Sequence, residues 1–136
     1  MTIILVSSRL ASLARPLAAV ALVLATTAAL AQMAPAKPGT SAKGPVMVDA
    51  KGMTLYTFDR DASGKSACTG PCTENWPPLM AGADAQASGD WSVIARPDGK
   101  KQWAYKGKPL YAWKNDKAPG ETSGDGFNGL WHMATP

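Results

Sequence analysis

Two cysteines are the residues of this sequence whose type and spacing most suggest chemistry, and they lie in the segment Cys68-Thr-Gly-Pro-Cys72. In an exported protein, an even and closely spaced cysteine pair usually forms a disulfide. Gly70 and Pro71 can bend the chain enough to bring the two Cα atoms within the ~7 Å limit. The three-residue gap differs from the two-residue gap of thioredoxin-like and haem-attachment sites. The spacing favours a structural disulfide, and a redox-active pair or a metal site are the alternatives.

Metal-ligating residues other than cysteine are few. His132 is the only histidine, so a metal site there would need cysteine, methionine or carboxylate partners. Thioethers suit Cu(I), but a methionine in a small core more often fills a gap, and the candidates are dispersed: Met47, Met53, Met80 and Met133. His132 is therefore only a weak candidate ligand, and we expect no cofactor. A periplasmic redox or metal-handling protein for copper or haem, using Cys68/Cys72 or His132 with methionines, is the alternative function.

A duplicated motif carries the carboxylates. Gly52-Met-Thr-Leu-Tyr-Thr-Phe-Asp-Arg-Asp61 returns 55 positions later as Gly107-Lys-Pro-Leu-Tyr-Ala-Trp-Lys-Asn-Asp116. A pair of carboxylates can serve acid–base catalysis. Each aspartate, however, follows a predicted strand by a few residues, where its side chain can accept hydrogen bonds from turn N–H groups. No nucleophile–histidine–carboxylate arrangement is recognisable, so we expect no catalytic residues and no enzyme. The repeat-motif residues are Tyr56, Phe58, Asp61, Tyr111, Trp113 and Asp116.

Aromatic residues are candidates for a ligand surface. Trp76 precedes Trp131 by the same 55 positions as the motif. Aromatic rings at a surface can stack on sugars or flat ligands, although in a small domain most of them must be core. We predict a possible binding surface at Trp76, Trp103, Tyr105 and Trp131.

The elements that position these residues read as β-strands. Val46–Val48 and Met53–Phe58 form a predicted hairpin whose two-residue loop is Lys51-Gly52, which places Val48 opposite Leu55. A meander follows over 91–95, 101–105 and 109–113, with a closing strand within 127–133. In this reading Leu55 and Leu110 face one side, and Tyr56 and Tyr111 face the other. No sustained helical periodicity follows Gln32, so we predict an all-β fold, a small antiparallel hairpin and meander domain built from two pseudo-repeats.

The first residues differ in composition from the rest. Arg9 and Arg15, the apolar run Leu17–Leu30 and an Ala-x-Ala ending predict a signal peptide over 1–31. Residues 32–44 contain little to bury and are predicted to be a flexible leader. The domain should span 45–136, with repeat one at about 45–80 and repeat two at about 91–136. Cleavage leaves 12 basic and 10 acidic residues, and this near-balance argues against nucleic acid as a partner. No stable membrane span is expected after cleavage.

The two Tyr-x-[Phe/Trp/Tyr]-x-x-Asp matches occur with Cys68-x-Gly-x-Cys72-x-x-x-Trp76-Pro-Pro-Leu79 and Gly126-Phe-Asn-Gly-Leu-Trp131. This combination resembles the bacterial secreted-repeat family of predicted lipoproteins, over about residues 45–136. The resemblance implies an exported envelope or extracellular protein with tandem repeats, and it implies no activity. The chain lacks the cysteine that a lipid anchor would need just after the apolar run. We therefore expect a periplasmic or secreted, unanchored protein that is a non-enzymatic binding or structural module, with an envelope component or protein as partner.

Overall fold

The computed structural model of the protein describes residues 34–136. The predicted signal peptide and the first residues of the predicted leader lie outside this range. The described strands are β1 (Lys37–Ser41), β2 (Gly44–Val48), β3 (Tyr56–Phe58), β4 (Met80–Ala81), β5 (Trp91–Ala95), β6 (Lys101–Tyr105), β7 (Lys108–Pro109) and β8 (Trp131–Met133). The helical pieces are short: α1 (Cys72–Asn75) and a 3₁₀ turn, η1 (Phe127–Gly129). The all-β prediction with little helix is confirmed.

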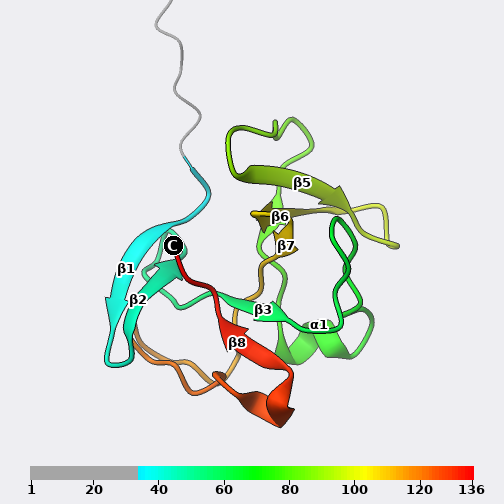
Figure 1. The fold of residues 1–136 in the computed structure, drawn as a ribbon. Coiled ribbons are helices and arrows are strands. Elements are labelled where there is room, and N and C mark those ends of the chain that lie inside the picture. Colours follow the sequence, from blue (N-terminus) through cyan, green and yellow to red (C-terminus); the bar gives the residue numbers. More distant parts are fainter. Residues whose placement is uncertain (1–33) are drawn as a thin grey trace, which may run out of the picture. The chain divides into compact units, whose positions relative to one another are not determined.

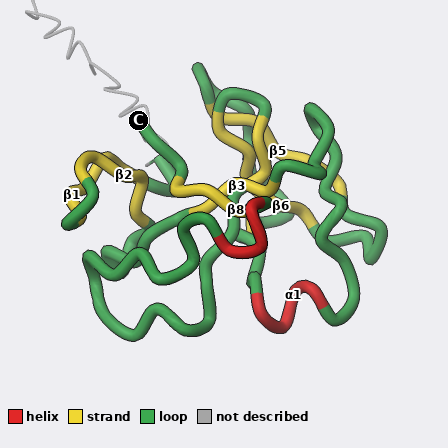
Figure 2. Tube along the Cα trace, turned by 60° about the horizontal axis from the view of Figure 1, so that its bottom comes forward, coloured by secondary structure: helices red, strands yellow, loops and turns green. Residues whose placement is uncertain are grey.

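The strands form three small antiparallel sheets. β1 pairs with β2, β3 pairs with β8, and β6 lies between β4 and β5 with β7 also paired to it. The β3–β8 pair lies between the β1–β2 hairpin and the β4–β6–β5 sheet (Figure 1). Loops make up most of the remaining chain (Figure 2). Such short strands depend on packing between sheets for their stability.

The prediction of a flexible leader over 32–44 is wrong from Lys37 onward. Residues 37–41 form β1, which runs antiparallel to β2 with Lys37 opposite Val48. Ala36, just before β1, is buried. Gly39 packs so closely on Val48 that a Cβ there would lie 2.8 Å from a Val48 methyl carbon. β1 has no buried residue, and the buried residues of this hairpin lie on β2, so hydrophobic patterning could not reveal β1.

The register of the first hairpin is shifted by one residue from the prediction. Val48 lies opposite Thr54, and the Leu55 N–H donates to the Met47 carbonyl. The Asp49 carboxylate accepts hydrogen bonds from the N–H groups of Lys51 and Met53, which stabilises a five-residue connection instead of a two-residue loop. Since a one-residue slip changes the face of every side chain, Leu55 packs with Met47 and not with Val48.

The second half follows the predicted strands at 91–95 and 101–105 but departs from a simple meander. Pro109 ends β7, and Tyr111 then bridges to Tyr56 and to Pro78 of the first repeat. The closing strand is β8, preceded by the 3₁₀ turn η1, and it pairs with β3 instead of with its own repeat. Strands of one repeat thus pair with strands of the other: β3 with β8, and β4 with β6.

The core consists of two clusters on opposite sides of the duplicated motif. The aromatic cluster contains Tyr56, Cys68, Trp76, Tyr111, Trp113 and Trp131, and the aliphatic cluster contains Ala36, Met47, Leu55, Leu110 and Ala134. The predicted division of the motif, with leucines on one side and tyrosines on the other, is confirmed. The alternation of a strand sends neighbouring side chains to opposite faces, which separates the two clusters.

Candidate functional site

The two copies of the motif meet at their tyrosines. The Tyr56 N–H donates to the Tyr111 carbonyl at 2.8 Å, and the Tyr111 N–H donates to the Tyr56 carbonyl at 3.0 Å. This reciprocal pair of hydrogen bonds is the pattern of an antiparallel hydrogen-bonded pair. The two repeats are therefore related by an approximate two-fold axis that passes between the tyrosines.

The tyrosine of each motif binds the aspartate of the other motif. The Tyr56 hydroxyl donates to Asp116 at 2.5 Å, and the Tyr111 hydroxyl donates to Asp61 at 2.7 Å. Burial raises the pKa of both tyrosines, and the aspartates raise it further; for Tyr111 it reaches about 12. Both hydroxyls are therefore protonated donors at neutral pH. The aspartates also accept turn N–H groups, from Ala67 to Asp61 and from Ser123 to Asp116, as the sequence predicted.

Four aromatic rings form a column across the same axis. Phe58 stacks on Trp131 at 4.2 Å, Trp131 on Trp76 at 3.7 Å, and Trp76 on Trp113 at 4.0 Å between ring centroids. Every one of these contacts joins a residue of the first repeat to a residue of the second. Offset and stacked aromatic pairs add about 0.5–1.5 kcal/mol each beyond their buried area. The motif aromatics are thus components of a shared core.

The predicted binding surface does not form at the tryptophans. Trp76 and Trp131 are 3% exposed and Trp103 is 9% exposed, because the repeats close over their rings. Tyr105 is half-buried, with Trp91 against its ring and the Lys106 ammonium 5.1 Å from the ring centroid. Of the four residues, only Tyr105 reaches the surface to a useful extent. The sequence gives the ring types, but their exposure depends on the cross-repeat pairing.

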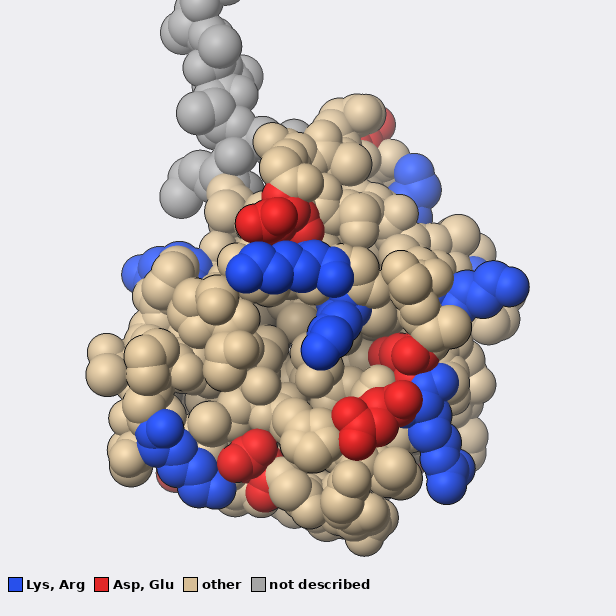
Figure 3. Space-filling view, in the orientation of Figure 1, with Lys and Arg blue, Asp and Glu red and all other residues tan. Residues whose placement is uncertain are grey.

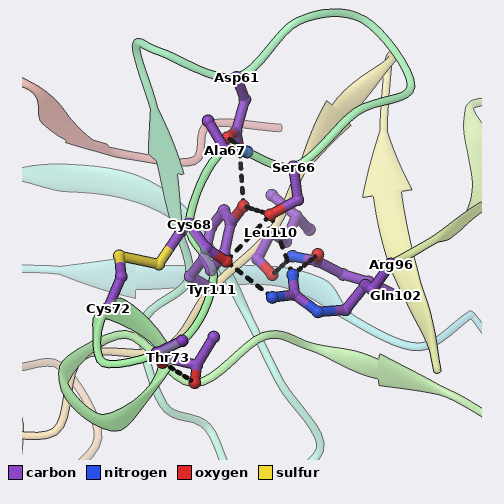
Figure 4. Close-up of a disulfide and its surroundings, with 11 residues drawn as sticks. Asp61, Ser66, Ala67, Cys68, Cys72, Thr73, Arg96, Gln102, Leu110 and Tyr111 are labelled. Carbon is purple, nitrogen blue, oxygen red and sulfur yellow. Dashed lines mark hydrogen bonds between the residues drawn. A yellow bond between two sulfur atoms is a disulfide. The ribbon is translucent and has the colours of Figure 1, made fainter. Parts of the chain in front are cut away.

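Cys68 and Cys72 form a disulfide whose Cα atoms are 5.3 Å apart. Figure 4 shows the loop around it held by a buried arginine. Arg96 donates through Nη2 to the Cys68 carbonyl at 2.6 Å, and through Nη1 to Ser66 at 2.9 Å and Gln102 at 2.6 Å. The Ser66 hydroxyl also contacts the Tyr111 hydroxyl at 2.6 Å. Ser66 and Arg96 were not among the predicted site residues, because neither belongs to the repeated motif.

His132 lies at the surface and contacts Asp59 through Nε2 at 2.8 Å. The neighbouring Met133 packs against the aromatic cluster, on the opposite face as strand alternation requires. Within residues 34–136, no three His, Cys, Asp or Glu side chains are grouped so that they could hold a metal ion. His132 therefore has one neighbouring carboxylate, that of Asp59, and within residues 34–136 it belongs to no group of three such ligands.

A polar groove of about 350 Å³ lies between the loop after β3 and the turn between β6 and β7. Its walls carry side chains of both charges: Asp59 and Asp61 from the first repeat, and Lys106 and Lys108 from the second. The turn is fixed by the positive φ of Lys106 (49°) and Gly107 (81°), which matches the twist of a tight hairpin. Lys and acidic side chains alternate over one face of the molecule instead of forming a single-sign patch (Figure 3). Both turns were predicted, but their juxtaposition was not.

Comparison with known proteins identifies the family. A family model described as a secreted repeat of unknown function matches residues 37–80 and 92–135. The chain belongs to this family. The matched ranges show that one family repeat begins at β1 and ends at β4, and the next begins within β5 and ends just after β8. The resemblance and the tandem-repeat prediction are confirmed, as is export in the general sense of a secreted family.

No curated protein sequence and no solved structure matches the chain. Within the part of this secreted-repeat protein that the structure describes, no helix is long and apolar enough to cross a membrane. The two family repeats contain the whole aromatic cluster, the aliphatic cluster except Ala36, and both walls of the groove. The groove is therefore a product of repeat pairing.

Proposed function

We propose that this secreted-repeat protein is a non-enzymatic binding module of the periplasm or cell envelope, and that it contacts its partner at the groove between residues 59–63 and 106–109. The observation that supports this proposal is the groove's construction from both repeats. One wall follows β3 of the first repeat, and the other is the β6–β7 turn of the second. Its partner is a polar envelope component or protein.

The charges of the groove suggest what kind of partner fits. Lys106 and Lys108 line the groove together with Asp59 and Asp61, and Phe58 and Pro109 add apolar lining. A pocket that combines a few polar groups with apolar surface is typical of a ligand site. A partner that carries amide, hydroxyl and both kinds of charged group, as wall-associated peptides and amino sugars do, complements this lining.

The non-enzymatic reading is supported by how the chemically capable side chains are used. Asp61 and Asp116 accept hydrogen bonds from tyrosines and turn N–H groups, and Asp59 contacts His132. Both cysteines are joined to each other. The tyrosine–aspartate contacts join the two repeats and the disulfide closes a loop within the first, so these side chains have structural roles and the groove is left as a binding surface.

The experiment compares matched variants in co-sedimentation with the bacterial envelope fraction. Lys106→Asn combined with Lys108→Gln removes both groove ammonium groups, and asparagine tolerates the positive φ of Lys106. Lys51→Gln combined with Lys100→Gln removes the same charge from turns outside the groove lining. We expect the groove variant to lose most of the bound fraction and the control to retain it. Equal binding by both variants would exclude the groove as the binding site. Absence of envelope binding by the wild type would overturn the proposed function.

The alternative function, redox or metal handling, is separated by two measurements on protein purified from the periplasm. Two free cysteines in a thiol titration of the native protein would favour this alternative over the binding module. Stoichiometric copper or haem, detected by metal analysis and visible absorption, would favour it as well. We expect no thiol without reductant, and no such metal or haem signal.

A further inference from the structure

Arg96 is a buried positive charge whose hydrogen-bond acceptors are all neutral. The residue is only 5% exposed, although arginine is rarely buried without a paired carboxylate. Its acceptors are the Ser66 hydroxyl, the Gln102 side-chain carbonyl and the Cys68 main-chain carbonyl. Among the described residues, no carboxylate lies within ion-pair distance of the guanidinium. The nearest link to a carboxylate runs through Ser66 and the Tyr111 hydroxyl to Asp61.

The guanidinium also has donors to spare. Arginine carries five N–H donors in a planar fork. Nη1 uses both of its hydrogens, on Ser66 and Gln102, and Nη2 uses one on the Cys68 carbonyl. The remaining donors are the Nε–H and the second Nη2–H, which have no acceptor among residues 34–136. Two adjacent N–H groups on one edge of a guanidinium match the two oxygens of a carboxylate.

This arginine lines a pocket of about 380 Å³ beside the disulfide. The other lining residues are Thr69, Gly70 and Thr73 on one side and Pro97 and Asp98 on the other. The disulfide closes the first wall between Cys68 and Cys72, and the Arg96–Gly99 turn forms the second, with the Gly99 N–H donating to the Arg96 carbonyl. In Figure 4 the guanidinium lies beside the Cys68 carbonyl, in the loop that also carries Ser66. The pocket is thus lined by the disulfide loop, by the Arg96–Gly99 turn and by a buried arginine.

We propose that the Arg96 pocket binds a carboxylate group, held by the Nε–H and Nη2–H edge of the guanidinium. None of its lining residues lines the groove of the proposed function, so the two sites are separate surfaces. A bound carboxylate would supply the direct ion-pair partner that Arg96 lacks among the described residues. The volume admits a small carboxylic acid or the end of a peptide chain, and the shared recognition element is the carboxylate itself. Asp98 at the rim carries a negative charge that weakens the site.

The test is an NMR titration of the mature protein that follows the Arg96 Nε–H and the Thr73 amide. The probes are acetate, a capped tripeptide with a free C-terminal carboxylate, and the same tripeptide with an amidated C-terminus. We expect saturable shifts at both positions with acetate and with the free carboxylate, and none with the amide. At least tenfold tighter binding of the peptide than of acetate would assign the source as a peptide end, and similar affinities would assign a small acid. Absence of a saturable shift with either carboxylate would overturn the proposal.

A variant at the rim of the pocket tests the proposal without disturbing the buried contacts of Arg96. Asp98→Asn removes the rim charge, and its amide oxygen can still accept the Lys100 N–H. We expect two- to fivefold tighter carboxylate binding, roughly the effect of one exposed charge nearby. Asp90→Asn makes the same change in net charge outside the pocket and should leave the affinity unchanged. Equal effects of the two variants would show a long-range charge effect and would contradict a carboxylate seated at Arg96.

Discussion

Corresponding loops of the two repeats, called corners below, share the same tyrosine–aspartate hydrogen bonds, which we call the frame. They differ in the residues that pack beneath the loop. In the cystine corner (Asp61, Ser66, Ala67, Cys68 and Tyr111), Asp61 accepts the Ala67 N–H and the Tyr111 hydroxyl. In the glycine corner (Tyr56, Asp116, Ser123 and Gly124), Asp116 accepts the Ser123 N–H and the Tyr56 hydroxyl. The residue that follows the bonded N–H is buried in both corners: Cys68 in one and Gly124 in the other.

The difference lies in what occupies the space under each loop. Cys68 is linked to Cys72, and its carbonyl accepts a hydrogen bond from Arg96. Gly124 has no side chain because Trp76 and Trp113 lie against it; a Cβ would be 2.8 Å from one ring and 3.0 Å from the other. One corner is thus closed by a covalent bond and a buried cation, and the other by close packing of large rings. Both corners contain the tyrosine–aspartate hydrogen bonds, whereas the residues that occupy the space beneath the loop differ between them.

Separating the two repeats should have the largest effect. A protease site placed within residues 82–89, in the connection between β4 and β5, allows the folded chain to be cut and the fragments to be parted in denaturant. We expect each fragment alone to lose the near-ultraviolet circular dichroism of the aromatic column, and mixing to restore it. The reason is that the tyrosine pairs and ring contacts cross between repeats. A single fragment that keeps the native spectrum as a monomer would contradict the prediction that the aromatic column forms only when the two repeats pair.

Gly124→Ala should break the glycine corner. The φ of Gly124 is outside the left-handed region, so the cost is steric: the added methyl group meets two large buried rings. Overpacking of this kind destabilises a core by about 3 kcal/mol at its upper range. Gly82→Ala, where nothing lies within 4 Å of the added carbon, is the matched control and should change stability by less than about 0.5 kcal/mol. Urea denaturation measures both, and equal effects would show that the corner is not tightly packed.

Cys68→Ala combined with Cys72→Ala should break the cystine corner at a smaller cost. The disulfide closes a loop of sequence separation 4. The chain-entropy relation gives about 2 kcal/mol for so short a loop. We expect the denaturation midpoint of the variant to match that of the reduced wild type, because both lack the same cross-link. A variant much less stable than the reduced wild type would show that the cysteine side chains stabilise the core mainly by packing.

The comparison of the corners also explains how far the sequence could predict this molecule. The strands at 91–95 and 101–105, the division of leucines from tyrosines and the cysteine pair follow from local pattern and spacing. The burial of Trp76 and Trp131 does not, because it depends on which repeat supplies the neighbouring strand. β1 was missed because its side chains carry no apolar pattern, and Arg96 was missed because two of its partners, Ser66 and Cys68, come from a distant loop. Duplication at a constant offset indicates two similar units, but it leaves open whether each unit satisfies its own motif or the other's.

The smallest expected effect is on how stability depends on pH. The contributions of Asp61, in the loop of the first repeat, and of Asp125, in the loop of the second, should change in opposite directions. Burial raises the pKa of Asp61 above its ordinary 3.8, although the Ala67 N–H, Tyr111 and Arg96 act against it. For Asp125, in the second loop, burial raises the pKa, but the Met133 N–H and the Lys43 ammonium outweigh it and the net pKa is lowered. A raised carboxyl pKa contributes stability below the unfolded-state pKa, which is lost as pH rises through the folded-state pKa. A lowered one contributes stability above the unfolded-state pKa, which is lost as pH falls through the folded-state pKa.

Asp61→Asn and Asp125→Asn isolate these contributions. Denaturation midpoints between about pH 3 and pH 6 cover both sides of the ordinary aspartate pKa of about 3.9. The stability difference between wild type and Asp61→Asn should fall as pH rises, since the wild type loses the contribution of the protonated carboxyl. The difference between wild type and Asp125→Asn should rise with pH over the same range, since the carboxylate gains its contacts with Met133 and Lys43. Differences that change in the same direction would show that the two loops do not hold their carboxylates in opposite environments, and that burial does not dominate at Asp61.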